Sequence, residues 1–138
     1  MKTALALLAA LAFVGCSTQI GVDNTQNSEA SFSNATGVLN TRYSADAEAV
    51  FNAVKRTIDA MPSTLRTGET DVRGPNKELL SVVVYVRTIG DLEIKITIEK
   101  TEDEVTKAIF TQVQIKYGFF GNLPESQKIV SKITSNLR

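Results

Sequence analysis

Serine and lysine are the residues of this chain that could form a catalytic pair, because the sequence contains no His. The candidates are Ser81, Ser126, Ser131, Lys128 and Lys132. None of them lies in a nucleophile elbow or in an S-x-x-K motif, the local patterns that activate a serine. We therefore expect solvated helix faces around the two lysines, no catalytic residues and no enzymatic activity.

Two clusters of charge could bind ions. Glu102-Asp103-Glu104 could attract a hard cation, but it lacks the ligand spacing of an EF-hand loop, and a charged hairpin turn is the better interpretation. Arg66, Arg73 and Lys77 could attract an anion, although the acidic residues between and beside them nearly cancel their charge. We expect no metal site and no cofactor.

The single cysteine, Cys16, excludes an intramolecular disulfide and a CxxC redox pair. Lys2 precedes an unbroken apolar run over residues 4–14, which is too short to cross a bilayer and is typical of a secretory signal peptide. The segment Phe13-Val14-Gly15-Cys16 then resembles the bacterial lipobox, in which the cysteine sulfur receives a diacylglycerol and the new amino terminus is acylated with a fatty acid such as palmitate.

The lipobox resemblance implies a signal peptide over residues 1–15 and lipidation at Cys16, with a membrane-anchored mature protein. Ser17 follows the cysteine, where Asp would favour retention at the inner membrane, so we expect an outer-membrane lipoprotein in the bacterial cell envelope. The alternative is an incidental cysteine after an ordinary signal peptide.

Residues 17–36 are rich in polar side chains: 12 of the 20 are Ser, Thr, Asn or Gln. Such a segment buries too little apolar surface to offset its chain entropy. We expect residues 16–36 to comprise the lipidated cysteine and a disordered tether that spans roughly 25 Å.

Residues 37–138 carry the patterns of a single folded domain. Apolar residues at helical spacing predict a helix over 45–61, with Ser44 as its N-cap, and a second helix after a cap at Asn122. Alternation predicts strands over 79–88, 92–99 and 105–117, preceded by a short extended segment at 38–43. Residues 62–77 read as a long irregular connection with one short strand around 65–72. The expected fold is α+β in the order βαβββα, an antiparallel three- to four-stranded sheet with both helices on one face.

Aromatic and apolar residues of the domain have two interpretations. They could be ordinary core, or they could surround an apolar pocket between a helix and the sheet, gated by residues 62–77. The residues that could line such a pocket are Phe51, Met61, Tyr85, Tyr117, Phe119 and Phe120.

The charge balance argues against nucleic-acid binding. The chain has 15 basic and 15 acidic residues, whereas a nucleic-acid binder usually carries a basic face that neutralises several phosphates. We expect a monomer that binds no nucleic acid.

The lipobox, the Tyr43-Ser44-Ala45 start before a helix, the strand meander and the segment Gly118-Phe119-Phe120-Gly121-Asn122 together resemble a family of small bacterial lipoproteins of unknown function. The chain is most similar to the Francisella-type virulence-associated surface lipoproteins. This resemblance implies a location and a fold, but no catalytic residues. It leaves three functions open: a noncatalytic module that binds an envelope or host protein, a carrier or sensor of a small apolar ligand, and a structural envelope protein.

Overall fold

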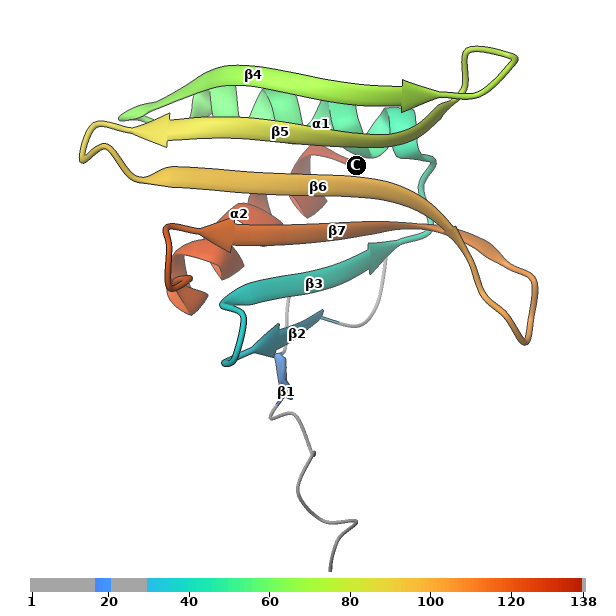
Figure 1. Cartoon of the computed structure of the whole chain (residues 1–138), viewed down its shortest axis with the longest axis horizontal. Helices are drawn as coiled ribbons and strands as arrows, with labels where there is room; N and C mark the ends of the chain where they lie inside the picture. The colour runs from blue at the N-terminus through green and yellow to red at the C-terminus, as the bar shows by residue number, and fades with distance from the viewer. Residues whose placement is uncertain (1–16, 21–29, 138) are drawn as a thin grey trace, which may run out of the picture.

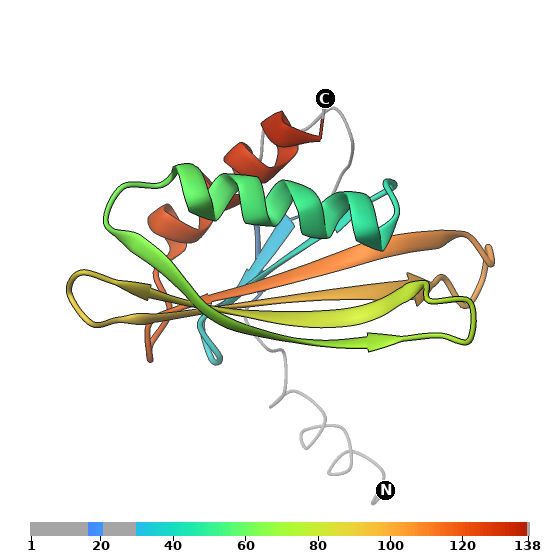
Figure 2. The same cartoon turned by 90° about the horizontal axis from the view of Figure 1, so that it is seen from above.

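The computed structural model describes residues 17–20 and 30–137. They form two layers, a twisted sheet and a pair of helices that cover one of its faces (Figures 1 and 2). The elements in chain order are β1 (Ser17–Ile20), β2 (Ala30–Ser33), β3 (Val38–Tyr43), α1 (Ala47–Ala60), β4 (Thr64–Arg73), β5 (Leu79–Thr88), β6 (Glu93–Glu102), β7 (Ile109–Tyr117) and α2 (Leu123–Asn136).

The sheet is antiparallel throughout, with the strand order β1-β2-β3-β7-β6-β5-β4. This confirms the α+β class and the placement of both helices on one face. The expected number of three to four strands was wrong, because the described residues form seven. The additional strands come from the segments interpreted as a tether and as an irregular connection.

Strand β2 belongs to the fold and not to a disordered tether. It pairs with β3, and its Ala30 and Phe32 side chains are only 5% and 7% exposed. The disordered tether was predicted from polar composition, but the polar Ser31 and Ser33 alternate along the strand with the buried Ala30 and Phe32. A free edge on β3 supplies hydrogen bonds that local composition does not reveal. Strand β1 extends the same pairing to Ser17.

Strand β4 confirms the short strand expected around residues 65–72 and is slightly longer, so less of the segment is irregular than expected. Its ten residues pair with β5, and register shifts interrupt the pairing between Arg66 and Gly68 and between Val72 and Arg73. Most of its side chains are exposed, so β4 lacks the apolar alternation that identifies a half-buried strand. The true turn is residues 74–78, where the Gly74 N–H donates to the Glu78 carbonyl at 2.8 Å.

Helix α1 supplies one wall of the core. Val50, Val54 and Ile58 lie on its buried face with at most 1% exposure. The helix agrees closely with the expected 45–61 span, but its N-cap is Asp46, whose carboxylate accepts a 2.7 Å hydrogen bond from the Ala49 N–H. The predicted cap at Ser44 was wrong.

Helix α2 begins as the sequence predicts. The Asn122 side chain accepts a hydrogen bond from the Glu125 N–H at 3.1 Å, and Pro124 lies in the first turn. Ile129, Val130 and Ile133 are buried. The helix packs on α1, β7 and β3.

The third predicted strand begins later than expected. β7 starts at Ile109, and residues 103–108 form a turn in which Asp103 accepts hydrogen bonds from the N–H groups of Val105 and Thr106. Val105 is 89% exposed and lies in this turn. Ile109 shares the strand face of Val113 and Ile115, but it is 61% exposed because it is the first residue of β7. The apolar side chain of Val105 had suggested a strand where the chain turns.

Candidate functional site

The space between the helices and the sheet is filled with side chains. Those that close it are fully buried at the centre of the domain. The fully buried apolar residues include Leu39, Val50, Val54, Val82, Val84, Val86, Ile94, Ile96, Ile98, Val113, Ile115, Val130 and Ile133. Close packing of this kind leaves an apolar ligand no room at the centre of the interface.

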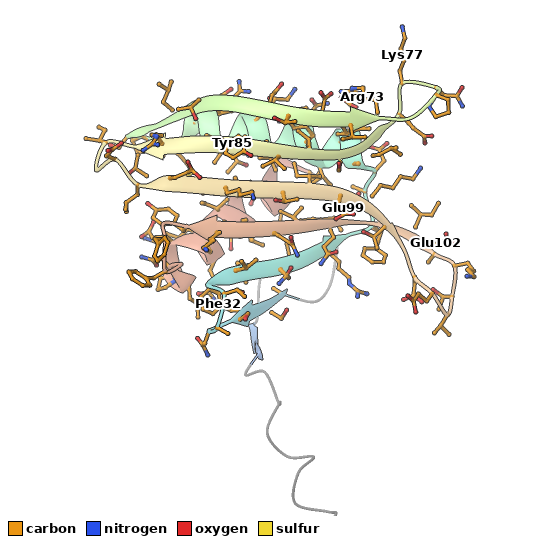
Figure 3. The ribbon with its side chains drawn as sticks, in the orientation of Figure 1. Phe32, Arg73, Lys77, Tyr85, Glu99 and Glu102 are labelled. Carbon is orange, nitrogen blue, oxygen red and sulfur yellow. The ribbon has the colours of Figure 1, made fainter. Side chains whose placement is uncertain are left out.

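The six residues expected to line an apolar pocket are not brought together. Phe51 is core, and Met61 and Tyr117 pack against the core from its margin. Tyr85 lies on the face of the sheet turned away from the helices, because its neighbours in β5 point inward (Figure 3). Phe119 and Phe120 are 80% and 86% exposed. The predicted helix–sheet pocket was therefore wrong, and none of these six residues lines the three cavities described below.

A cavity of about 410 Å³ lies instead beside the start of helix α1. Its apolar wall is Leu79, Ile109 and Phe110, and its polar wall includes Glu48, Glu78 and Lys100. The Lys100 Nζ lies 3.0 Å from Glu78 Oε2, and Arg73 holds Glu48 at 3.0 Å from outside the cavity. The paired charges leave a mixed surface suited to a small amphipathic molecule.

The edge of the sheet at β4 is open. β4 pairs only with β5, so one row of its backbone groups faces outward among the described residues. Leu65 and Val72 on this strand are 69% and 54% exposed. A cavity of about 320 Å³ lies between residues 65–69 and Asp59 of α1, and a further cavity of about 420 Å³ joins Leu65 to Ile89 at the β5–β6 turn.

Ion pairs fix β4 against helix α1. Arg66 binds Asp59 through two bonds, Nε to Oδ1 at 2.7 Å and Nη2 to Oδ2 at 3.0 Å, and the guanidinium lowers the pKa of the Asp59 carboxyl. At the other end of the strand, Arg73 pairs with Glu48 and Asp71. Of the three basic residues considered as an anion site, Arg66 and Arg73 are thus paired with carboxylates, and Lys77 lies in the 74–78 turn.

A second exposed region lies at the turn between β7 and α2. We call it the aromatic corner and define it as Leu92, Lys95, Lys116, Phe119 and Phe120. The two phenyl rings contact each other edge to face, with centroids 4.9 Å apart, and the Lys116 Nζ lies 5.6 Å from the centre of the Phe119 ring. Lys95 and Lys116 are directly opposite each other on neighbouring strands.

The turn between β7 and α2 depends on two glycines and carries two exposed aromatic rings. Gly118 and Gly121 have φ of 73° and 80°, values that glycine adopts without strain. Phe119 and Phe120, for which core and pocket positions were both considered, are instead exposed to solvent after the end of β7 at Tyr117. The pairing of Lys95 with Lys116 was not predicted. The register of the β6–β7 hairpin could have revealed it.

The candidates for chemistry are separated by the fold. Ser126 is fully buried in α2, while Lys128 is exposed and pairs with Glu125 at 3.0 Å. Ser131 and Lys132 are exposed on the same helix. Among residues 17–20 and 30–137, no three His, Cys, Asp or Glu residues gather in a way that could hold a metal ion. Cys16 lies outside the described residues.

No helix in the described part of the chain is long and apolar enough to cross a membrane. A comparison with curated proteins returned no match. A family model described as "Protein of unknown function (DUF3568)" matches residues 1–136, nearly the whole chain. The chain therefore belongs to the DUF3568 family, whose function is not known.

Proposed function

We propose that this protein is a lipid-anchored lipoprotein of the bacterial outer membrane that acts, without catalysis, as an interaction module in the envelope. The signal-peptide pattern and the lipobox ending at Cys16 support the anchor. The resemblance to the Francisella-type virulence-associated surface lipoproteins supports a contribution to virulence, with an envelope or host protein as the partner.

The observation that carries the interaction is the open edge strand β4. An extended segment of a partner could add to this edge through backbone hydrogen bonds, and the exposed Leu65 and Val72 would supply apolar contacts. Charged residues and register shifts on β4 reduce indiscriminate pairing between edges. Strand β4 is also the edge opposite β1 in the sheet order, and so opposite the anchored end of the chain.

Site-specific photocrosslinking in intact bacteria tests this function. A photoreactive residue at Thr70, exposed on β4, should capture one defined envelope or host protein. The same residue at the exposed Lys132 of α2 is the matched control and should not. Capture of the same proteins from both positions, or of none from Thr70, would contradict the β4 interface.

The anchor has its own test. Cys16→Ser removes the sulfur that would carry the lipid, so the variant should leave the membrane fraction and keep the mass of an unlipidated chain. A variant that sediments with membranes as the wild type does would remove the anchoring proposal.

Binding of a small molecule is the second candidate, and the cavity beside α1 favours it. In an NMR titration, a ligand there should shift the signals of Leu79, Ile109 and Phe110 and leave the distant Phe119 unchanged. Shifts spread evenly over the domain would argue against the cavity.

A further inference from the structure

The aromatic corner has exposed apolar and basic groups but no cavity of its own among those described. Phe119 and Phe120 present two phenyl rings at the tip of a turn, and Lys95 and Lys116 lie behind them on the sheet. We propose that the aromatic corner inserts into the anionic lipid surface beside the anchored amino terminus and so fixes the orientation of the domain on the membrane. This inference rests on the proposed lipid anchor and deepens it.

The chain connects the anchor to this corner in a few steps. Cys16 is bonded to Ser17, so their Cα atoms are about 3.8 Å apart. Ser17 pairs with Ser33 across the β1–β2 ladder, and the Gly37 N–H donates to the Ser33 carbonyl at 2.8 Å. A lipid on Cys16 would therefore be attached next to the β2–β3 turn.

The β2–β3 turn packs directly on the β7–α2 turn. A Cβ atom at Gly37 would collide with the carbonyl oxygen of Phe120 and would lie 2.9 Å from Gly121 Cα. Figures 1 and 2 both show the two turns side by side at one end of the sheet. The exposed phenyl rings thus lie close to the point where the lipid would hold the chain.

The charge of the corner also fits a lipid surface. Lys95 and Lys116 form a cross-strand pair of like charges, an arrangement that destabilises a sheet. Lys95 has no ion pair within the described residues, and the contact of Lys116 there is the Phe119 ring. Anionic headgroups would neutralise both lysines, while the rings enter the boundary of the acyl chains.

A lipid surface fits better than a protein partner or a second copy of the chain. Aromatic anchors at protein interfaces fill pockets, and apolar residues at a turn tip next to a lipidated residue supply the second signal that stable membrane attachment requires. The chain contains no Trp, so one introduced at the corner is a unique fluorescent reporter.

The experiment uses the full lipidated protein, extracted from bacterial membranes and reconstituted into phosphatidylglycerol-containing vesicles with brominated acyl chains. Phe120→Trp reports the corner. Val105→Trp is the matched control, because Val105 is equally exposed, at 89%, at the opposite end of β7. We expect the bromines to lower the Trp emission roughly twofold or more at position 120 and to leave position 105 unchanged.

Vesicle flotation separates the two proposals. A protein that floats with the vesicles while Trp at position 120 is not quenched, or is quenched no more than at position 105, overturns the inference and leaves the anchor intact. A protein that does not float overturns the anchor and the inference together. A concentration-dependent blue shift of the position 120 emission in detergent without lipid would assign the corner to self-association and overturn the proposal.

The lysines provide an independent arm. Lys95→Gln should lower the ratio of docked to undocked protein about fivefold in anionic vesicles, the effect of one lysine near the surface, and should not change it in zwitterionic vesicles. The exposed Lys132→Gln on α2 is the charge-matched control. Equal effects of the two substitutions would overturn the role of the corner lysines.

Discussion

Tyr43 joins the sheet to helix α2 through its hydroxyl group. The side chain is fully buried, and the hydroxyl lies 3.0 Å from Thr134 Oγ1 and 3.3 Å from the Val130 carbonyl oxygen. Burial raises the pKa of the Tyr43 phenol to about 12, partly opposed by the hydrogen bond with Thr134. The fold therefore favours the neutral phenol and resists its ionisation.

This residue predicts a loss of stability in alkaline solution. A pKa that is higher in the folded state gives a contribution that is complete below pH 10 and is lost as the pH rises toward 12. We expect the free energy of unfolding of the wild type to fall by roughly 2 kcal/mol more than that of Tyr43→Phe between these pH values. Urea denaturation at several pH values between 10 and 12 measures this difference. If the free energy of unfolding depended on pH in the same way for wild type and Tyr43→Phe, the raised pKa of Tyr43 would be contradicted.

The contact between the β2–β3 and β7–α2 turns depends on Gly37. Its φ is 70°, and a side chain there would meet the Phe120 carbonyl. Gly37→Ala should therefore lower the free energy of unfolding by about 2 to 4 kcal/mol, from backbone strain and overpacking together. Gly68→Ala in β4 is the control, because no atom lies within 4 Å of the point that its Cβ would occupy, and it should change stability by at most about 0.5 kcal/mol.

At the level of elements, sequence patterns identified the parts with strong periodicity. Helices α1 and α2 and strands β5 and β6 were predicted within a few residues, because each buries one regular face. The edge strands were harder to predict: β2 was interpreted as part of a tether, and β4 was expected only as a short strand around 65–72. The physical reason is that β4 buries almost nothing and β2 buries only Ala30 and Phe32. Their backbone hydrogen bonds come from neighbours distant in sequence, which no local pattern contains.

The candidate sites were harder to predict than the fold. The sequence pattern placed Tyr85 within a strand but did not show which face of the sheet it lies on. The structure shows that the adjacent Val84 and Val86 face the core, so Tyr85 lies on the other face. Phe119 and Phe120 were considered as core or as lining of a pocket, but the turn motif around them takes the chain out of the core. The cavity beside α1 combines residues from four separated segments and has no local signature.

Phe32 distinguishes a structural β2 from a tether. Truncation of this buried ring in Phe32→Ala should lower the free energy of unfolding by about 3 kcal/mol, through lost burial and the cavity left behind. Phe119→Ala removes an equally large but exposed ring and should change stability by at most about 0.5 kcal/mol in the absence of lipid. Equal denaturation midpoints for wild type and Phe32→Ala would show that β2 does not stabilise the fold and would support its interpretation as part of a tether.

At the scale of the whole molecule, the strand order places β1, next to the proposed anchor, and the open strand β4 at opposite edges of the sheet. β1 follows directly on Cys16, and β4 lies at the opposite edge, so six inter-strand spacings of about 4.8 Å separate the two strands by roughly 30 Å. In the proposed arrangement this distance, rather than a disordered tether, would carry the open edge away from the membrane. The aromatic corner would then limit the rotation of the domain, so that β4 is presented in a defined direction.

The same order predicts where the folded domain begins. A fragment of residues 37–138, the boundary that the sequence suggests, lacks β1 and β2. Because it loses the buried Phe32 and exposes the edge of β3, it should be less stable than residues 17–138 by about 3 kcal/mol or more and prone to aggregate through that edge. Urea denaturation and light scattering of both fragments measure the two effects.

A third fragment, residues 30–138, separates the contributions of the two strands. It keeps Ala30 and Phe32 and their pairing with β3, so we expect it to recover most of the stability that residues 37–138 lose. If the 37–138 fragment were as stable and soluble as the 17–138 fragment, β3 would be the first strand of the stable domain and the edge strand of its sheet. The anchor would then regain a flexible connection, and a lipid on Cys16 could no longer hold the aromatic corner against the membrane.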